Sequence, residues 1–232
     1  MFGVMGMSAA FAQAACAKVK KAAGNYIKII STVADPVVAS LTCIGEIAVE
    51  SIKNGVAVIE TYSDLSAAQL AIQADVNTEI KIIGDVTVFI CGEYRGWGYA
   101  DTVLAKSLEF NNNVLTQVIV SGKGNPDATS TVESMVFNNT TALTSLNCYG
   151  CAGLTALDLS ANTALTSLSC YGCAGLTEVK YPATNEGVST EIASVITNAD
   201  AADGKVYTDS AADYYSTIAD AATAKGWTIN QL

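Results

Sequence analysis

A tandem repeat in the second half of the chain restricts the fold more than any other feature of the sequence. Residues 143–164 read LTSLNCYGCAGLTALDLSANTA and residues 165–186 read LTSLSCYGCAGLTEVKYPATNE, so the period is 22 residues. Each copy divides into two units of 11 residues, headed by Leu143, Leu154, Leu165 and Leu176. Because one unit cannot bury its own apolar edge, such units are stable only when they stack. The repeat therefore predicts a stack of short coils that is closed by a cap at each end.

Apolar residues occupy the fourth and sixth places of each unit. The fourth place holds Leu146, Leu157, Leu168 and Val179, and the sixth holds Cys148, Leu159, Cys170 and Tyr181. Side chains two residues apart on an extended segment point to the same side, so this spacing predicts an apolar ladder inside the stack. Asn162 stands at the ninth place, where a turn is expected and its side chain can satisfy backbone groups. Residues 107–120 resemble residues 134–148, so the stack is expected to begin at about residue 104.

Four cysteines of the repeat have the spacing of a zinc site. Cys148 and Cys151 form one C-x-x-C pair and Cys170 and Cys173 form another, 18 residues further on. The repeat period itself relates the two pairs, and Leu159 and Asn162 occupy the equivalent places between them. This arrangement favours cysteine as a small apolar residue of the ladder, with disulfides and metal binding as the alternatives. The odd total of seven cysteines favours a reducing compartment.

The segments on either side of the repeat are predicted to cap it. In the N-terminal cap, residues 61–103, we expect a helix over 64–74 and strands over 79–83 and 85–90. In the C-terminal cap, residues 187–232, we expect a helix over 190–197, a strand over 205–208, a helix over 210–224 and a strand over 227–229.

Residues 1–60 are apolar and are predicted to be mostly helical and to attach the chain to a partner. Residues 1–17 carry no charge, and Leu41, Ile44, Ile47 and Ile52 have the three-to-four spacing of a helix that ends at the Asn54-Gly55 pair. Such a segment more often forms an anchor or a subunit interface than a free surface. A truncated signal peptide, a lipoprotein signal with Cys16 as the lipidated residue, and a short membrane span are alternatives for its beginning.

Together these patterns predict an α+β fold in four parts. A helical apolar N-terminal part (residues 1–60) is followed by a cap (61–103), a short leucine-rich-repeat β-solenoid (104–186) and a C-terminal α/β cap (187–232).

The composition argues against most kinds of enzyme and against nucleic-acid binding. The chain has no histidine, which removes the usual general base near neutral pH and the commonest zinc ligand. Its acidic residues are scattered singly, without the pairing that acid-base hydrolysis needs. A net charge of −10 repels phosphate backbones. We therefore predict a non-enzymatic protein without catalytic residues, metal or cofactor.

One aromatic loop is a candidate binding site. Tyr94, Arg95, Trp97 and Tyr99 lie close together between glycines. Tyrosine, tryptophan and arginine are enriched at recognition hot spots, and aromatic rings also suit sugars. The alternative is a loop that folds over the edge of the stack and buries its own rings.

The repeat resembles the leucine-rich repeats of surface proteins from gut bacteria. The resemblance covers residues 104–186 and rests on phrases such as NTALTSL (162–168) and LDLS (157–160). Residues 211–232 resemble the end of such modules in virion proteins of tailed phages. The resemblance implies host recognition or adhesion. It points to a virion component attached to a capsid or tail, with protein partners at the N-terminal region and a host-surface protein or glycan as ligand. A secreted or lipid-anchored bacterial adhesin is the alternative.

Overall fold

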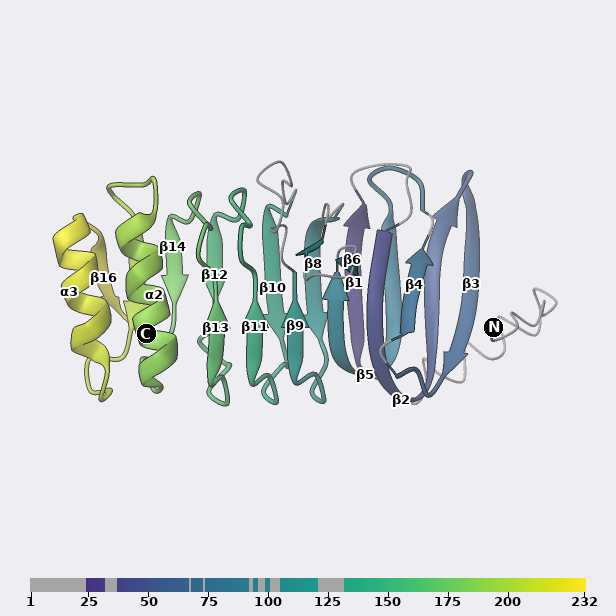
Figure 1. Ribbon diagram of the computed structural model, residues 1–232, viewed down its shortest axis with the longest axis horizontal. Helices are drawn as coiled ribbons and strands as arrows, with labels where there is room; N and C mark the ends of the chain where they lie inside the picture. The colour runs from purple at the N-terminus through teal and green to yellow at the C-terminus, as the bar shows by residue number, and fades with distance from the viewer. Residues whose placement is uncertain are drawn as a thin grey trace.

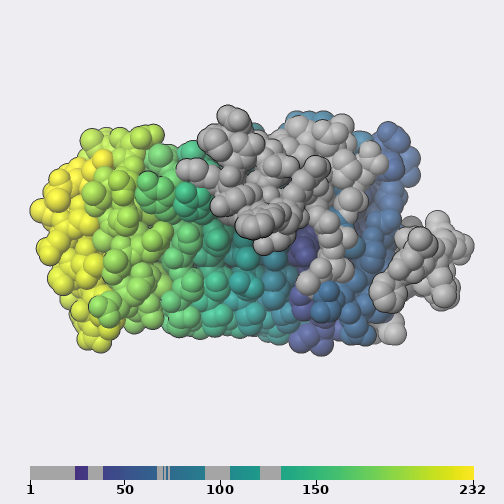
Figure 2. All heavy atoms as spheres, viewed as in Figure 1, coloured from purple at the N-terminus to yellow at the C-terminus, as the bar shows by residue number. Residues whose placement is uncertain are grey.

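The structure, a computed structural model, describes residues 24–31, 37–66, 68–72, 74–91, 94–95, 99–100, 105–120 and 132–232. Most elements are strands that lie side by side along the long axis of an elongated molecule (Figure 1). From the repeat to the C-terminus, the order of the chain follows that axis on the surface as well (Figure 2). The possible signal sequence and Cys16 lie outside the described residues.

The N-terminal part of the described chain is an antiparallel sheet. Its five strands are β1 (Tyr26–Ser31), β2 (Val37–Lys53), β3 (Val56–Ser63), β4 (Ala68–Ile72) and β5 (Glu79–Cys91). The long strand β2 pairs with β4 near its start, with β3 near its end and with β5 along its other edge. β1 lies between β5 and β8 (Ala105–Asn111). Residues 26–31 and 37–60 therefore belong to the main sheet.

A tight turn joins β2 to β3. Asn54 and Gly55 have φ angles of 53° and 73°, which a two-residue hairpin of this kind requires and which glycine adopts most easily. The Asp75 carboxylate accepts hydrogen bonds from both backbone amides, at 2.8 Å from Asn54 and 2.7 Å from Gly55. The Asn-Gly pair thus ends a strand rather than a helix.

Two predicted helices are wrong: the one that was to end at Asn54-Gly55 and the one over residues 64–74. Both segments contain strands. In β2 the pairing with β5 shifts register between Thr42 and Cys43 and again between Ile44 and Ala48. Gly45, at a φ of 70°, lies in the second irregularity, and Ile44 points into solvent there. The buried residues keep the two-residue alternation of a strand on both sides of this irregularity, at Leu41 and Cys43 and again at Ile47 and Val49. The three-residue spacing that resembles a helix arises because the exposed Ile44 is also apolar.

The repeat forms two rows of parallel strands. One row contains β9 (Gln117–Ile119), β11 (Ser145–Asn147) and β13 (Ser167–Ser169), and β9 pairs with β5. The other contains β10 (Ser134–Asn138), which pairs with β8, and β12 (Ala156–Asp158) and β14 (Glu178–Lys180), which pair with each other. Partners in β11 and β13, and in β12 and β14, are 22 residues apart.

The last part of the chain alternates helices and strands. It contains α2 (Glu186–Asn198), β15 (Lys205–Thr208), α3 (Tyr215–Lys225) and β16 (Thr228–Gln231). The two strands extend the row of β12 and β14 into a four-stranded parallel sheet. The helices and strands predicted for this part are confirmed, with shifted boundaries. Neither of the described helices is both long enough and apolar enough to cross a membrane.

The predicted fold class is wrong. The chain is mostly β, the two helices of the described part both lie after residue 185, and no helical apolar N-terminal part is present among the described residues. The first strands of the repeat also do not form a separate solenoid. They continue one curled, mixed, ten-stranded sheet that begins with β1 to β5. The pairing of Phe89 in β5 with Val118 in β9 makes this join.

A single large apolar core extends along the molecule and contains residues from Ile27 to Trp227. Three phenylalanines connect its N-terminal part to the repeat. The ring of Phe110 lies 5.4 Å from that of Phe89, edge to face, and 5.2 Å from that of Phe137, stacked. Each such pair adds about 0.5–1.5 kcal/mol beyond the area it buries. The N-terminal sheet and the repeat therefore share one core.

Candidate interaction surface

The outer face of the four-stranded sheet carries a row of polar side chains. The row is Asp158 on β12, Lys180 on β14, Tyr207 on β15 and Asn230 on β16, and each is the register partner of the next. The apolar residues that precede them, Leu157, Val179 and Val206, point inward and are buried. Alternation along each short strand thus places the row on the side away from the core. Parallel sheets are usually covered on both faces, so an outward polar face is an unusual surface.

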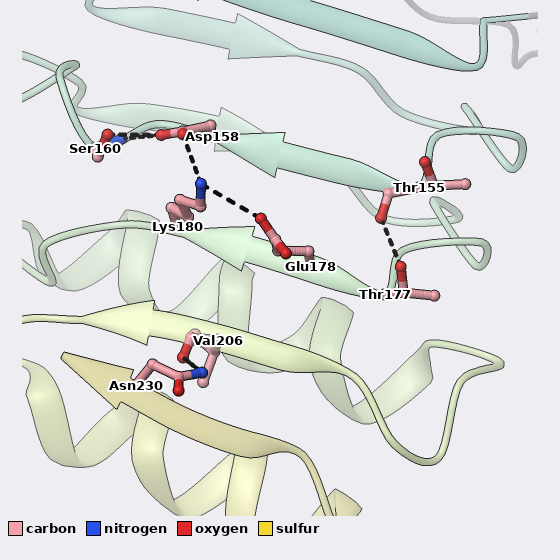
Figure 3. Close-up of polar contacts among 8 residues, drawn as sticks. All are labelled: Thr155, Asp158, Ser160, Thr177, Glu178, Lys180, Val206 and Asn230. Carbon is pink, nitrogen blue, oxygen red and sulfur yellow. Dashed lines mark hydrogen bonds and ion pairs between the residues drawn. The ribbon is translucent and has the colours of Figure 1, made fainter. Parts of the chain in front are cut away.

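Ion pairs and hydrogen bonds order the first half of this row (Figure 3). Lys180 Nζ lies 3.3 Å from Asp158 Oδ2 and 3.4 Å from Glu178 Oε1. The Ser160 backbone amide and hydroxyl both donate to Asp158 Oδ1, at 3.1 and 2.6 Å. Side-chain exposure of a third for Lys180 and of half for Asp158 keeps both groups in contact with solvent.

Aromatic and amide groups continue the row. The Lys180 ammonium lies 5.3 Å from the centre of the Tyr207 ring, which is within the range of a cation–π contact. Asn230 Nδ2 donates to the Val206 carbonyl at 3.5 Å, and Figure 3 shows this contact beside the Lys180 cluster. At the start of the strands, the Thr177 hydroxyl donates to the Thr155 carbonyl at 3.1 Å. The surface is therefore a set of donors and acceptors at fixed spacing.

The charges of this row suit recognition better than proton transfer. Partial burial raises the pKa of Asp158, but the hydrogen bonds from Ser160 and the contact with Lys180 outweigh it, so the pKa lies below its ordinary value. The Asp158 contact raises the pKa of Lys180 above its ordinary value. A general acid or base needs a pKa near the working pH. Both shifts move away from neutrality, so both groups stay charged.

A second polar cluster lies on the ten-stranded sheet. Lys28 on β1 lies 3.6 Å from Glu79 and 3.5 Å from Glu109, and the Tyr26 hydroxyl donates to Glu109 at 2.7 Å. The hydrogen bond from Tyr26 lowers the pKa of Glu109. The Lys81 ammonium lies 4.7 Å from the centre of the Tyr26 ring. These contacts link β5, β1 and β8 across their exposed side.

The predicted aromatic loop is only partly described. Tyr94 and Arg95 form β6 (Tyr94–Arg95), which pairs in antiparallel fashion with β7 (Tyr99–Ala100). Trp97 lies outside the described residues, and so do the side chains of Tyr94, Arg95 and Tyr99. Whether these rings bind a ligand stays a prediction.

The structure places the repeat cysteines in the core. All six cysteines of the described part are buried free thiols. Cys151 Sγ donates to the Val120 carbonyl and Cys173 Sγ to the Cys148 carbonyl, each at 3.1 Å. The hydrogen bond with Cys170 raises the pKa of Cys148, and the hydrogen bond with Cys148 raises that of Cys173. Thiols held protonated in this way are poor nucleophiles. Within the described residues, no three potential ligand side chains are grouped so that they could hold a metal ion.

The leucines of the ladder differ in their surroundings. Leu146 and Leu157 are each 1% exposed, whereas Leu168 is only partly buried. Leu168 lies at the end of the ladder, because β13 is the last strand of its sheet and α2 packs beside it. Asn162 is buried, and its amide donates to the carbonyl and hydroxyl of Thr140, both at 2.9 Å. Its predicted role toward backbone groups is confirmed.

Sequence reasoning missed the polar row and one aromatic pair. The signal for Asp158 and Lys180 was present, since each follows the buried apolar residue of its strand. The rings of Tyr149 and Tyr171 stack with their centres 5.7 Å apart and their planes 24° from parallel. Both repeats contain the identical motif CYGC, and its tyrosines could have indicated this pair. The predictions used only the cysteines of that motif.

The comparisons with known proteins add no relative. No protein-family model, curated protein sequence or solved structure matches the chain. The likeness to leucine-rich-repeat surface proteins therefore stays a resemblance of short phrases. A function for this chain has to be argued from its own surface.

Proposed function

We propose that the chain is a non-enzymatic structural and binding protein: a phage virion component, attached to a capsid or tail, that displays its sheet surface for recognition of a host surface or protein. The observation that carries the proposal is the ordered polar row from Asp158 to Asn230. Its groups are held by neighbouring strands, so little side-chain freedom is lost when a partner binds. Its two charged members also stay ionised, which suits binding.

The buried thiols give further support. Burial raises the pKa of Cys91 to about 12, and Cys148, Cys170 and Cys173 are raised as well. In the described part, none of these sulfurs offers a reactive thiolate at neutral pH. Long-lived free thiols also suit assembly in a reducing compartment, as in the cytoplasm where virions form.

The opposite end of the molecule is suited to attachment. Ile52, Val56 and Val76 are exposed around the β2–β3 turn, and Val56 is 63% exposed. Asp75, the neighbour of Val76, binds that turn through its carboxylate, so the three side chains belong to one end of the sheet. Exposed apolar groups of this kind commonly mark contacts between proteins.

The test separates attachment from recognition in the particle that contains the chain. Lys180→Glu places three acidic groups side by side, and we expect it to reduce adsorption to the host while incorporation stays normal. Lys106→Glu is the matched control, because Lys106 also pairs with a carboxylate, Glu133 at 3.7 Å, but lies away from the row.

Val56→Asp should have the reverse effect and reduce incorporation into the particle. Equal adsorption of the Lys180→Glu and Lys106→Glu particles would contradict the role of the row. Recovery of the chain from the bacterial envelope, and not from particles, would contradict the virion assignment and favour the adhesin.

A further inference from the structure

An aromatic stack forms on the turns of the repeat, away from the polar row. Tyr149 and Tyr171 occupy the same place in successive repeats, and their rings stack at 5.7 Å. Each is followed by a glycine in the left-handed region, Gly150 at a φ of 76° and Gly172 at 80°. A Cβ on Gly172 would lie 3.3 Å from the Gly150 backbone, so the two turns pack closely. Their close packing holds the rings in register.

The stack is open at its second ring. Tyr171 is 52% exposed, and among the described residues its one ring contact is with Tyr149. The residue 22 positions further along is Ala193, in α2, so the repeat supplies no third ring. An exposed ring at the end of an ordered stack offers a flat surface to a ligand.

A carboxylate is bound to the backbone next to Tyr171. Glu191 of α2 accepts a hydrogen bond from the backbone amide of Cys170 at 2.9 Å, which fixes its carboxylate next to the residue that precedes Tyr171. The negative face of an aromatic ring attracts the C–H groups on the apolar side of a pyranose. The Glu191 carboxylate has two oxygens, so it can also accept hydrogen bonds from sugar hydroxyls.

We propose that Tyr149, Tyr171 and Glu191 form a binding platform for a neutral saccharide. A neutral sugar is favoured because the chain carries a net charge of −10, which repels acidic glycans. The inference rests on the proposed display function, since it names the class of ligand on the host surface. It concerns a different surface from the polar row.

The test uses the full chain on an array of neutral oligosaccharides and polysaccharides: glucans, mannans, galactans and oligomers of N-acetylglucosamine. We expect at least one of these to bind, and Tyr171→Ala to weaken that binding roughly tenfold, as loss of a stacked ring implies. Tyr171→Phe should retain binding, and Glu191→Gln should weaken it. Asp158→Ala, on the other surface, should leave it unchanged.

Two results would overturn the platform. In the first, no saccharide of the array binds the native chain more strongly than it binds the Tyr171→Ala variant. In the second, a saccharide binds and Tyr171→Ala leaves its affinity unchanged. Binding of an aromatic peptide in place of every sugar would also overturn it. Because Tyr171→Ala could disturb the turn, the Tyr171→Phe and Glu191→Gln variants supply the same test with the fold kept. Incorporation into particles is measured separately, so its failure contradicts the proposed function and leaves the saccharide result standing.

Discussion

Truncation of Leu146 to alanine tests the core of the repeat. Leu146 is 1% exposed and lies on β11, in register with Val118 on β9 and Leu168 on β13. Strands on both sides hold their positions by hydrogen bonds, so the cavity cannot collapse. We therefore expect Leu146→Ala to lower the free energy of unfolding by about 3–5 kcal/mol, in the upper part of the range for buried leucines.

Leu168→Ala is the matched control, because the same atoms are removed from the same place in the next repeat. Leu168 is only partly buried and lies on the last strand of its sheet, so the loss should be about 1–2 kcal/mol. Equilibrium unfolding in urea measures both. With an m-value of about 3 kcal/mol/M, the midpoint should fall by roughly 1–1.7 M for Leu146→Ala and by less than about 0.7 M for Leu168→Ala. Equal shifts, or a larger shift for Leu168→Ala, would refute the stacking register.

Three further predictions concern buried thiols, close packing and charge. The pKa of Cys91 is raised to about 12 from an ordinary 9.0, so its contribution is fully present below pH 9 and is lost as the pH rises toward 12. The loss should amount to about 1.4 kcal/mol at pH 10. Urea unfolding at pH 8 and pH 10 should therefore show a smaller fall in the free energy of unfolding for Cys91→Ala than for the native chain. Gly204→Ala would place a methyl group within the Trp227 ring, so it should lower the free energy of unfolding by about 1–3 kcal/mol. Gly187→Ala, near the start of α2, should leave stability unchanged or raise it. Thermal unfolding of the two variants measures the difference. The pKa of Asp158 is lowered in the folded state, so its stabilising effect is present above the unfolded pKa and is lost as the pH falls through the folded pKa. Asp158→Asn should therefore make the free energy of unfolding fall slightly less steeply on acidification. The same change of the urea midpoint between pH 5 and pH 2 in both proteins would contradict this.

Local features could be predicted from the sequence where the repeat period or nearby residues determine them. Strand partners 22 residues apart follow from the identical LTSL phrases, and the hydrogen bond of Asn162 follows from its place at a turn. The C-terminal helices and strands have ordinary start and stop signals, such as the αL Gly226 after α3. Each of these depends on neighbouring residues or on the period.

The remaining features depend on long-range pairing. The bulges of β2 cannot be read from its residues, because they arise where it turns from one pairing partner to another. The pairing of β5 with β9 joins two segments whose sequences share no pattern. In the polar row, Tyr207 and Asn230 come into line with Lys180 only after two helical connections. No repeat relates these residues, so their alignment needed the structure.

The intact mass of the protein from purified particles tests the central claim most directly. The account predicts that the chain is recovered with the particles and that it still carries residues 1–15. Retention of residues 1–15 would agree with assembly in the cytoplasm. A mass shortened by those residues, or increased by a lipid on Cys16, with the chain in the bacterial envelope, would contradict the virion assignment.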